Sequence, residues 1–256
     1  MISSTEINKK YYKIKRAARM GSSLCKKALQ YAPFRMGKKF KENRITGKDI
    51  KMIDTIIFDI GKVLVDWNWK EYLESFGYSQ EKNEKISNAV FLSEYWKETD
   101  RGVWSDEEIL QSFIGKVPEY EKEVRELWEH MEKCVTRYDY TDKWIGELKE
   151  KGYKVYYLSN YGKTLREKTA KALGFVEQCD GGIFSYEVQK IKPDIEIYQA
   201  LIEKYQLNPG SCLFFDDVEE NIEGARKAGI HGILFEGYEK ACQTILNKRG
   251  KKTEIC

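Results

Sequence analysis

The sequence has few of the residues that most often build nucleophilic triads and metal clusters. It contains two histidines, His130 and His231, and its six cysteines are scattered with no C-x-x-C pair. These residues leave little material for a histidine-based triad, and nothing in them suggests a zinc site. The chemistry of the protein is therefore to be sought among its carboxylates, hydroxyls and lysines.

Long apolar runs are missing as well. No stretch of the sequence approaches the roughly 18–20 apolar residues that cross a bilayer, and the N-terminus lacks the apolar core of a secretory signal. These two absences predict a cytoplasmic protein with no transmembrane segment. With 256 residues, of which 41% are hydrophobic, the chain is long enough for one α/β domain with an insertion or for two small domains.

Acidic residues are scarce at the start of the chain, and basic residues are not. Residues 1–51 carry 15 Lys and Arg against three acids, a net charge of +12, whereas the remainder has a net charge of −9. We predict that residues 1–50 form a separate basic extension, with a weakly amphipathic helix within Tyr11–Phe34. Three interpretations stay open: a segment that binds an anionic partner such as a membrane surface or nucleic acid, an organellar presequence, and a solvated tail.

Short apolar, β-branched runs alternate with amphipathic stretches in most of the remaining chain. Strands are expected at 55–58, 154–158, 182–185, 211–215 and 230–235. Helices are expected at 144–151, 163–173, 195–205 and 219–228, with a final helix from Tyr238. This alternation is typical of a parallel α/β sheet flanked by helices.

Residues 67–138 interrupt the alternation. They are aromatic and acidic with helical spacing and no strand-like pattern. We predict a helical cap at 67–138, inserted after the first strand of a core built from 51–66 and 139–256. Within the cap, Ser105 and Glu108 fit the N-cap and N3 positions of a helix start. Trp96, Arg101 and Trp104 fit either the core of the cap or a contact with a polar substrate.

Polar side chains stand at the ends of the expected strands and before one helix. They are Asp59, Ser159 with Asn160, Lys192, and Asp216 with Asp217. Taken singly, most of them are ordinary turn residues, surface lysines or helix caps. Because open α/β sheets bind ligands at the carboxyl ends of their strands, we expect these side chains to converge. The adjacent pair of carboxylates is the sharpest of these signals, because a bound divalent cation would relieve its repulsion, and hard oxygen ligands favour Mg²⁺.

The order of these groups resembles the four motifs of the haloacid dehalogenase-like (HAD) hydrolase superfamily, over about residues 53–236. The motifs are Phe-Asp-Ile-Gly-Lys-Val, Leu-Ser-Asn, Lys-Pro-Asp and Phe-Phe-Asp-Asp, the last followed by Asn221. The bacterial branch that dephosphorylates α-D-glucose 1-phosphate and related sugar phosphates is the most similar. The resemblance implies a Rossmann-like parallel sheet with an inserted cap, and a Mg²⁺-dependent phosphatase that hydrolyses a small phosphomonoester, with a sugar phosphate as the candidate substrate.

The resemblance also implies a role for each group. Asp59 would be the nucleophile that forms an aspartyl-phosphate. Ser159, Asn160 and Lys192 would bind the phosphoryl group, and Lys192 would restrain Asp59. Mg²⁺ would be held by Asp59, the Gly61 carbonyl, Asp216 and Asp217.

One position departs from the pattern. Most HAD phosphatases carry a second Asp two residues after the nucleophile as an acid–base group, and here that residue is Gly61. A missing acid–base group costs on the order of 10²–10⁴ in rate. Asp66 is the nearest replacement in sequence, although it fits a loop cap equally well. The alternative function is a weakly active or inactive phosphate-binding regulatory module, tethered through residues 1–50.

Overall fold

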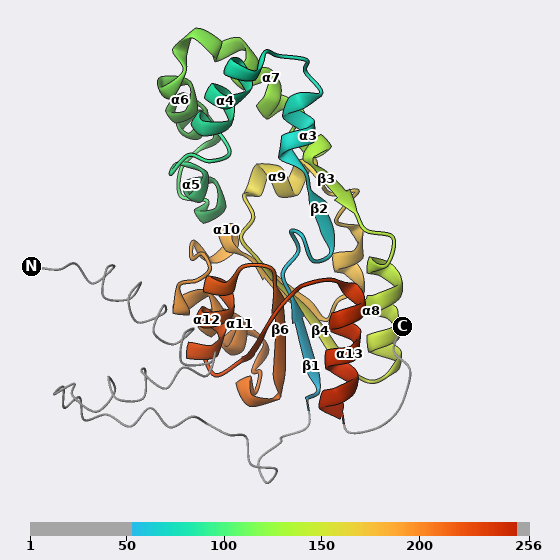
Figure 1. Cartoon of the computed structure of the whole chain (residues 1–256). Coiled ribbons are helices and arrows are strands. Elements are labelled where there is room, and N and C mark those ends of the chain that lie inside the picture. The colour runs from blue at the N-terminus through green and yellow to red at the C-terminus, as the bar shows by residue number, and fades with distance from the viewer. Residues whose placement is uncertain (1–52, 250–256) are drawn as a thin grey trace, which may run out of the picture. The chain divides into compact units, whose positions relative to one another are not determined.

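The computed structural model describes residues 53–249, and the predicted extension at 1–50 lies outside them. The described part is an α/β structure with a five-stranded parallel sheet (Figure 1). Its strands, in spatial order, are β5 (Gly181–Phe184), β4 (Lys154–Ser159), β1 (Thr55–Phe58), β6 (Cys212–Asp216) and β7 (His231–Leu234). Within 53–249, no helix has the length and apolar character to cross a membrane.

The central strand β1 is buried along its whole length. Phe58 lies opposite Tyr157 of β4 and Phe215 of β6, and all strand pairs of the sheet are parallel. An apolar strand covered on both faces is what a parallel sheet requires. The predicted fold class is therefore confirmed, and each expected strand lies within one residue of its predicted position at both ends.

Helices cover both faces of the sheet (Figure 1). Successive side chains of a strand point to opposite faces, so Ile56 and Phe58 pack in one cluster with α8 (Thr141–Glu150) and α13 (Tyr238–Arg249). Ile57 packs in the other cluster, with α11 (Ile195–Tyr205) and α12 (Glu219–Lys227). Two short helices, α9 (Lys163–Lys168) and α10 (Ser185–Val188), follow β4 and β5 at the carboxyl end of the sheet.

Residues 69–134, the inserted segment, are helical. They comprise α3 (Trp69–Glu74), α4 (Gln80–Ala89), α5 (Trp96–Arg101), α6 (Asp106–Lys116) and α7 (Glu121–Glu129), with short 3-10 turns at Pro118–Tyr120 and Met131–Cys134. The helix start predicted at Ser105 is confirmed, because Ser105 and Glu108 form a reciprocal capping box. The segment lies beyond the carboxyl ends of the strands (Figure 1).

Two local predictions were wrong. The segment predicted as free of strands is entered by β2 (Val65–Trp67) and left by β3 (Val135–Arg137), which pair as a short antiparallel ribbon. The helix expected at 163–173 ends at Lys168. Thr169 bends the chain there, since its hydroxyl donates to the Leu165 carbonyl and also pairs with the Tyr161 hydroxyl.

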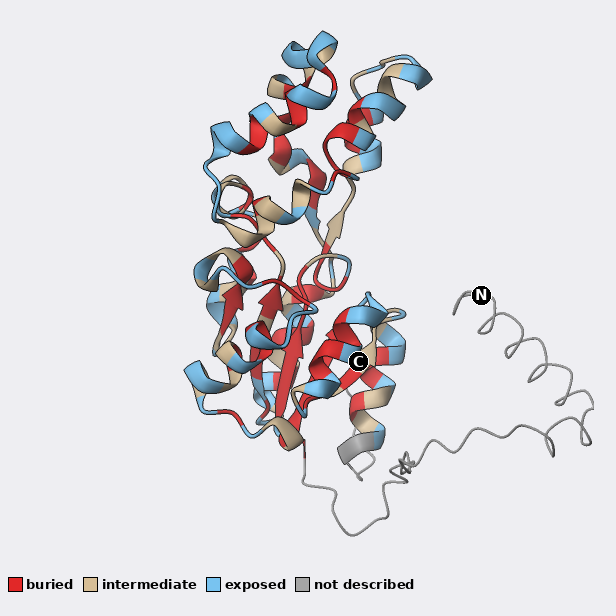
Figure 2. Ribbon diagram, turned by 90° about the vertical axis from the view of Figure 1, so that its left-hand side faces the viewer, coloured by how far each residue is buried: buried red, intermediate tan, exposed pale blue. Residues whose placement is uncertain are grey.

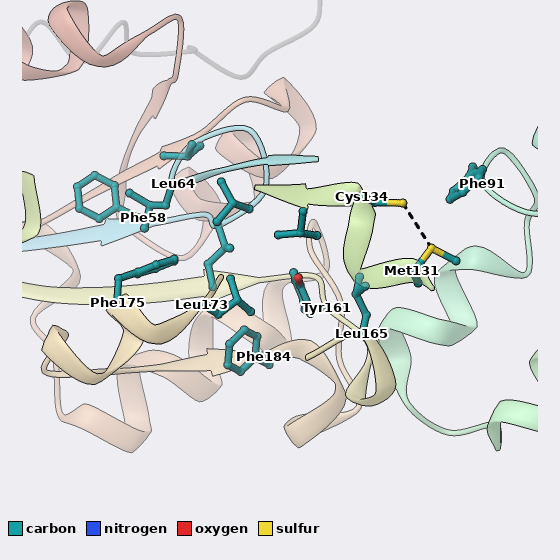
Figure 3. Packing of buried hydrophobic residues seen from close by; sticks show 14 of the residues in the cluster. Phe58, Leu64, Phe91, Met131, Cys134, Tyr161, Leu165, Leu173, Phe175 and Phe184 are labelled. Atoms are coloured by element: carbon teal, nitrogen blue, oxygen red, sulfur yellow. Dashed lines mark hydrogen bonds between the residues drawn. The ribbon is translucent and has the colours of Figure 1, made fainter. Parts of the chain in front are cut away.

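The inserted segment packs on the sheet domain through one continuous apolar cluster. Figure 3 shows this cluster extending from Phe58 in the sheet through Tyr161 and Leu165 to Met131 and Phe91 of the inserted segment. Buried residues accordingly occur in both parts of the chain (Figure 2). This packing fixes the inserted helices over the strand ends that carry the predicted site.

Candidate active site

A buried lysine joins two carboxylates from neighbouring strands. Asp59 follows β1 and Asp216 ends β6, and Lys192 lies between them on the loop before α11. Its Nζ is 2.8 Å from Asp59 Oδ1 and 2.7 Å from Asp216 Oδ2. The Lys192 side chain is only 1% exposed, so it contributes positive charge inside the protein rather than on its surface.

The lysine is held at its backbone as well. Its N–H donates to Asn160 Oδ1 at 2.7 Å, and Asn160 Nδ2 donates to its carbonyl at 3.0 Å. Asn160 follows β4, so this reciprocal pair links a third strand end to the loop. Next to it, the buried Ser159 hydroxyl makes no hydrogen bond with any described residue. That hydroxyl is therefore available to a ligand.

Asp216 is saturated by protein donors. Its Oδ1 accepts from the Val218 N–H at 2.8 Å, and Asn221 Nδ2 lies 3.0 Å from both carboxylate oxygens. Asn221 is fixed in turn, since Tyr198 donates to its carbonyl at 2.7 Å. With Lys192 on Oδ2, the carboxylate is immobilised and acts as the anchor of the lysine.

The neighbouring Asp217 adds a third carboxylate. Oxygens of Asp59, Asp216 and Asp217 all lie within 4.8 Å of one another. Burial raises the pKa of Asp217, repulsion by Asp216 raises it further, and Lys192 lowers it. One lysine against three carboxylates leaves an excess of negative charge, which a divalent cation with oxygen ligands would neutralise.

Burial also shifts the pKa values of Asp59 and Lys192. It raises the pKa of Asp59 to about 7, against the attraction of Lys192 and together with the repulsion of Asp216. Burial lowers the pKa of Lys192, but the attraction of Asp216 and Asp59 outweighs it and the net direction is upward. Lys192 is therefore protonated at neutral pH, and it lowers the pKa of Asp59 against the effect of burial.

A cavity of about 100 Å³ opens beside Asp59. Of the residues predicted for the site, it is lined by Asp59, Gly61, Ser159 and Asn160, whereas Lys192, Asp216 and Asp217 are not among its lining residues. Its remaining lining is mostly apolar and comes from β2, β3, α5, α9 and Tyr161. The sheet and the inserted segment thus share one cavity, which the predicted nucleophile Asp59 helps to line.

A scan against protein-family models matches residues 53–229 to the haloacid dehalogenase-like hydrolases. The chain belongs to this family. The matched range contains all four motifs, so the predicted resemblance is confirmed and the chain is identified as a HAD-like hydrolase.

Three proteins illustrate the relationship. Phosphatase MT3486 of Mycobacterium tuberculosis is 31% identical over 93 residues, which span 36% of this chain and only 43% of that protein. D-ribitol-5-phosphate phosphatase of Bacteroides thetaiotaomicron is 25% identical over 70% of this chain and 89% of its own length. A HAD family enzyme from B. thetaiotaomicron superposes with a TM-score of 0.62 at 21% identity, over 76% of this chain and 98% of that one. The same enzyme, solved with magnesium and inorganic phosphate, superposes with a TM-score of 0.58 at 21% identity, over 74% of this chain and 98% of that one.

The inserted segment of this HAD-like hydrolase adds two polar or aromatic side chains to the cavity, Trp96 and Asp100. Trp96 is the one member of the predicted trio at the cavity, since Arg101 pairs with Glu98 at 3.5 Å and Trp104 packs beside Tyr95. Asp100 was missed. It stands in a fully polar stretch from Lys97 to Arg101, where spacing cannot single out one carboxylate.

Proposed function

We propose that this HAD-like hydrolase is a Mg²⁺-dependent phosphatase that hydrolyses a small phosphomonoester through an aspartyl-phosphate, with a sugar phosphate as the candidate substrate. The observation that carries the proposal is the Asp59–Lys192–Asp216 cluster, whose Asp59 lines the cavity together with the unpartnered Ser159 hydroxyl. A phosphoryl group needs a nucleophile, positive charge and hydrogen-bond donors at one place, and these residues supply all three. The named activities of MT3486 and the ribitol-phosphate enzyme support the same reaction class.

The donor set fits magnesium. Asp59 and Asp217, together with the Gly61 carbonyl, offer the hard oxygen ligands that this ion prefers. Asp216 belongs to the same cluster, but its oxygens already accept from Lys192, Val218 and Asn221. We therefore assign it to positioning Lys192 rather than to direct coordination. When bound, the ion would neutralise the repulsion between carboxylate and phosphate and stabilise charge in the transition state.

The residues of the chain define the first chemical step. Asp59 Oδ1 accepts from the Ile60 N–H at 2.7 Å and from Lys192 at 2.8 Å, which fixes the rotation of the carboxylate. Oδ2 would attack phosphorus as the bond to the leaving oxygen breaks. Ser159 would donate to a phosphoryl oxygen, while Asn160 would keep Lys192 in place and present its remaining N–H. Attack of water on phosphorus would then release phosphate and restore Asp59.

The inserted segment takes the place of a cap in this proposal. Its Trp96 and the β2 and β3 residues of the cavity wall would contact the part of the substrate that carries no phosphate. Selection among phosphomonoesters would then depend on residues outside the four motifs. An anionic partner for residues 1–50 stays a prediction from charge alone.

The test is phosphate release from a panel of sugar phosphates and other phosphomonoesters, with Mg²⁺ and with EDTA. Wild-type protein should release phosphate in Mg²⁺ and stop in EDTA, and Asp59→Asn should be inactive in both. Asp54→Asn is the matched control, because Asp54 lies at the other end of β1, where it accepts from the Thr55 hydroxyl. It should retain full activity.

The rival function is a phosphate-binding module with little turnover, and Gly61 is the feature that favours it. In that case no substrate would be hydrolysed above the Asp59→Asn background. Titration calorimetry would nevertheless show inorganic phosphate binding to the protein in Mg²⁺. Release that persists in EDTA or in Asp59→Asn would contradict the proposed mechanism outright.

A further inference from the structure

The missing acid–base group leaves open space at Gly61. A Cβ placed on Gly61 would meet nothing within 4 Å, so the position lines the cavity without filling it. The nearest replacement in sequence, Asp66, does not reach this space. Val65 and Trp67 line the cavity, and the alternation of a strand puts Asp66 on the opposite face of β2. There it pairs with Lys62 at 2.5 Å and borders a separate hollow.

Asp100 lines the same cavity from the inserted segment. Among the described residues that line the cavity, it is the one carboxyl besides Asp59. It belongs to α5 of the inserted segment, and no described residue donates a hydrogen bond to its carboxylate. Its surroundings are the apolar walls of the cavity, including Trp96 and Leu165. A half-buried carboxyl with no protein partner, in the same cavity as the predicted nucleophile, is available to the substrate.

The backbone around Asp100 is seated tightly on the sheet domain. Ser185, which begins α10, donates its hydroxyl to the Asp100 carbonyl at 2.5 Å. On one side, a Cβ on Gly162 would lie 2.8 Å from the Thr99 carbonyl oxygen. On the other side, Gly102 has φ +68° and packs so closely on Tyr186 that a Cβ would come within 2.6 Å of it. These contacts fix where α5 presents its carboxyl.

We propose that Asp100 is the acid–base residue of this site, supplied by the inserted segment in place of the residue absent at Gly61. The inference rests on the proposed phosphatase function. In the first step, Asp59 bonds to phosphorus, the bond to the leaving oxygen breaks, and Asp100 gives that oxygen its proton. In the second step, Asp100 takes a proton from the attacking water, and the water oxygen bonds to phosphorus. The bond between phosphorus and Asp59 breaks, and its electron pair returns to the Asp59 carboxylate.

The electrostatics agree with this assignment. Burial raises the pKa of Asp100 to about 7, Lys192 lowers it, and Asp59 raises it. A group that titrates near neutral pH can both donate and accept a proton there. Asp100 in turn acts on Tyr161, whose pKa is raised mainly by burial and further by the Asp100 carboxylate.

Asp100→Asn tests the proposal with two kinds of substrate. An alkyl phosphate needs a proton on its leaving oxygen, and an aryl phosphate such as p-nitrophenyl phosphate does not. For the alkyl phosphate, kcat should fall by about 10²–10⁴-fold. For the aryl phosphate, a burst of nitrophenol equal to the enzyme concentration should remain, followed by slow turnover as the aspartyl-phosphate accumulates. Asp100→Glu, which keeps the carboxyl, should recover part of the alkyl rate.

Asp66→Asn is the matched control and should hydrolyse both substrates like the wild type. Thermal unfolding of each variant detects a loss of folded protein. Loss of the nitrophenol burst together with the alkyl rate, or a higher KM at unchanged kcat, would overturn the inference, because these results mark a structural or binding role. Active wild type with fully active Asp100→Asn would also overturn it and leave the phosphatase intact. Wild type that is inactive on every substrate would overturn both proposals.

Discussion

Replacing Lys192 with methionine tests the charge cluster independently of any activity. Lys192 compensates two buried carboxylates, at 2.8 Å from Asp59 and 2.7 Å from Asp216. Methionine fills a similar volume but leaves both carboxylates without a positive partner. Removing one member of a buried ion pair costs about 3–5 kcal/mol. Because Lys192 lowers the pKa of Asp59 in the wild type, Asp59 should respond by taking up a proton.

The measurement is urea unfolding at pH 7 in EDTA, compared with the exposed neighbour Lys190→Met as the control. We expect the free energy of unfolding to fall by about 3–5 kcal/mol for Lys192→Met, and hardly at all for the control. In thermal unfolding, the same loss corresponds to a drop in Tm of roughly 6–20 °C for a chain of this size. Added Mg²⁺ should restore part of the stability, since it would supply a positive charge to Asp59, one of the two carboxylates left without Lys192.

A double-mutant cycle isolates the interaction. Asp216→Asn combined with Lys192→Met removes the uncompensated charge, so the double variant should be more stable than Lys192→Met alone. A loss below about 1 kcal/mol for Lys192→Met would refute the reasoning, because losses of that size are typical of exposed pairs. A double variant that shows the simple sum of the two single losses would refute it as well.

Three further predictions concern stability and packing. In EDTA, Asp59 has a folded-state pKa of about 7 against an ordinary value of 3.8, so its contribution to stability is complete below pH 3.8 and is lost as pH rises through 7. Urea unfolding should show the free energy of unfolding falling over this window, and Asp59→Asn should flatten that slope; an equal slope contradicts the assignment. Ser105→Ala removes the capping box and should lower the free energy of unfolding by about 0.5–2 kcal/mol, measured by thermal unfolding. No loss would mean that the cap does not contribute to stability. Gly162→Ala places a Cβ 2.8 Å from the Thr99 carbonyl oxygen, and it should cost about 1–3 kcal/mol and reduce phosphate release. Gly115→Ala, whose Cβ meets nothing within 4 Å, is its control and should not be destabilised.

The sequence contained most of what builds the sheet and the charge cluster. Strand β1 was predicted to the residue, because an apolar β-branched run ending in Asp and Gly has few other structures available. Lys192 was found through the motif that surrounds it, and the structure brings it to Asp59 and Asp216. Parallel strands end at one edge of a sheet, so topology alone brings their polar residues together.

What sequence reasoning missed depends on tertiary contacts. Strands β2 and β3 have three residues each and are separated by the whole inserted segment, so neither shows a periodic pattern of its own. Asp100 is one carboxylate among 41 acidic residues. It is distinguished by the Ser185 and Gly162 contacts that seat its helix on the sheet domain, and these partners are 85 and 62 residues away in sequence.

The β2–β3 ribbon has a consequence for how such a chain can change over evolution. Because Val65–Trp67 pairs with Val135–Arg137, the inserted segment begins and ends at neighbouring points in space. A segment with adjacent ends can be lengthened, shortened or exchanged for another without altering the register of the sheet that bears Asp59 and Lys192. If Asp100 has the role inferred here, an exchange would replace the acid–base residue along with the substrate contacts. The residues that select the substrate and the residue that transfers the proton would then be inherited together in the inserted segment, separately from the nucleophile on the sheet.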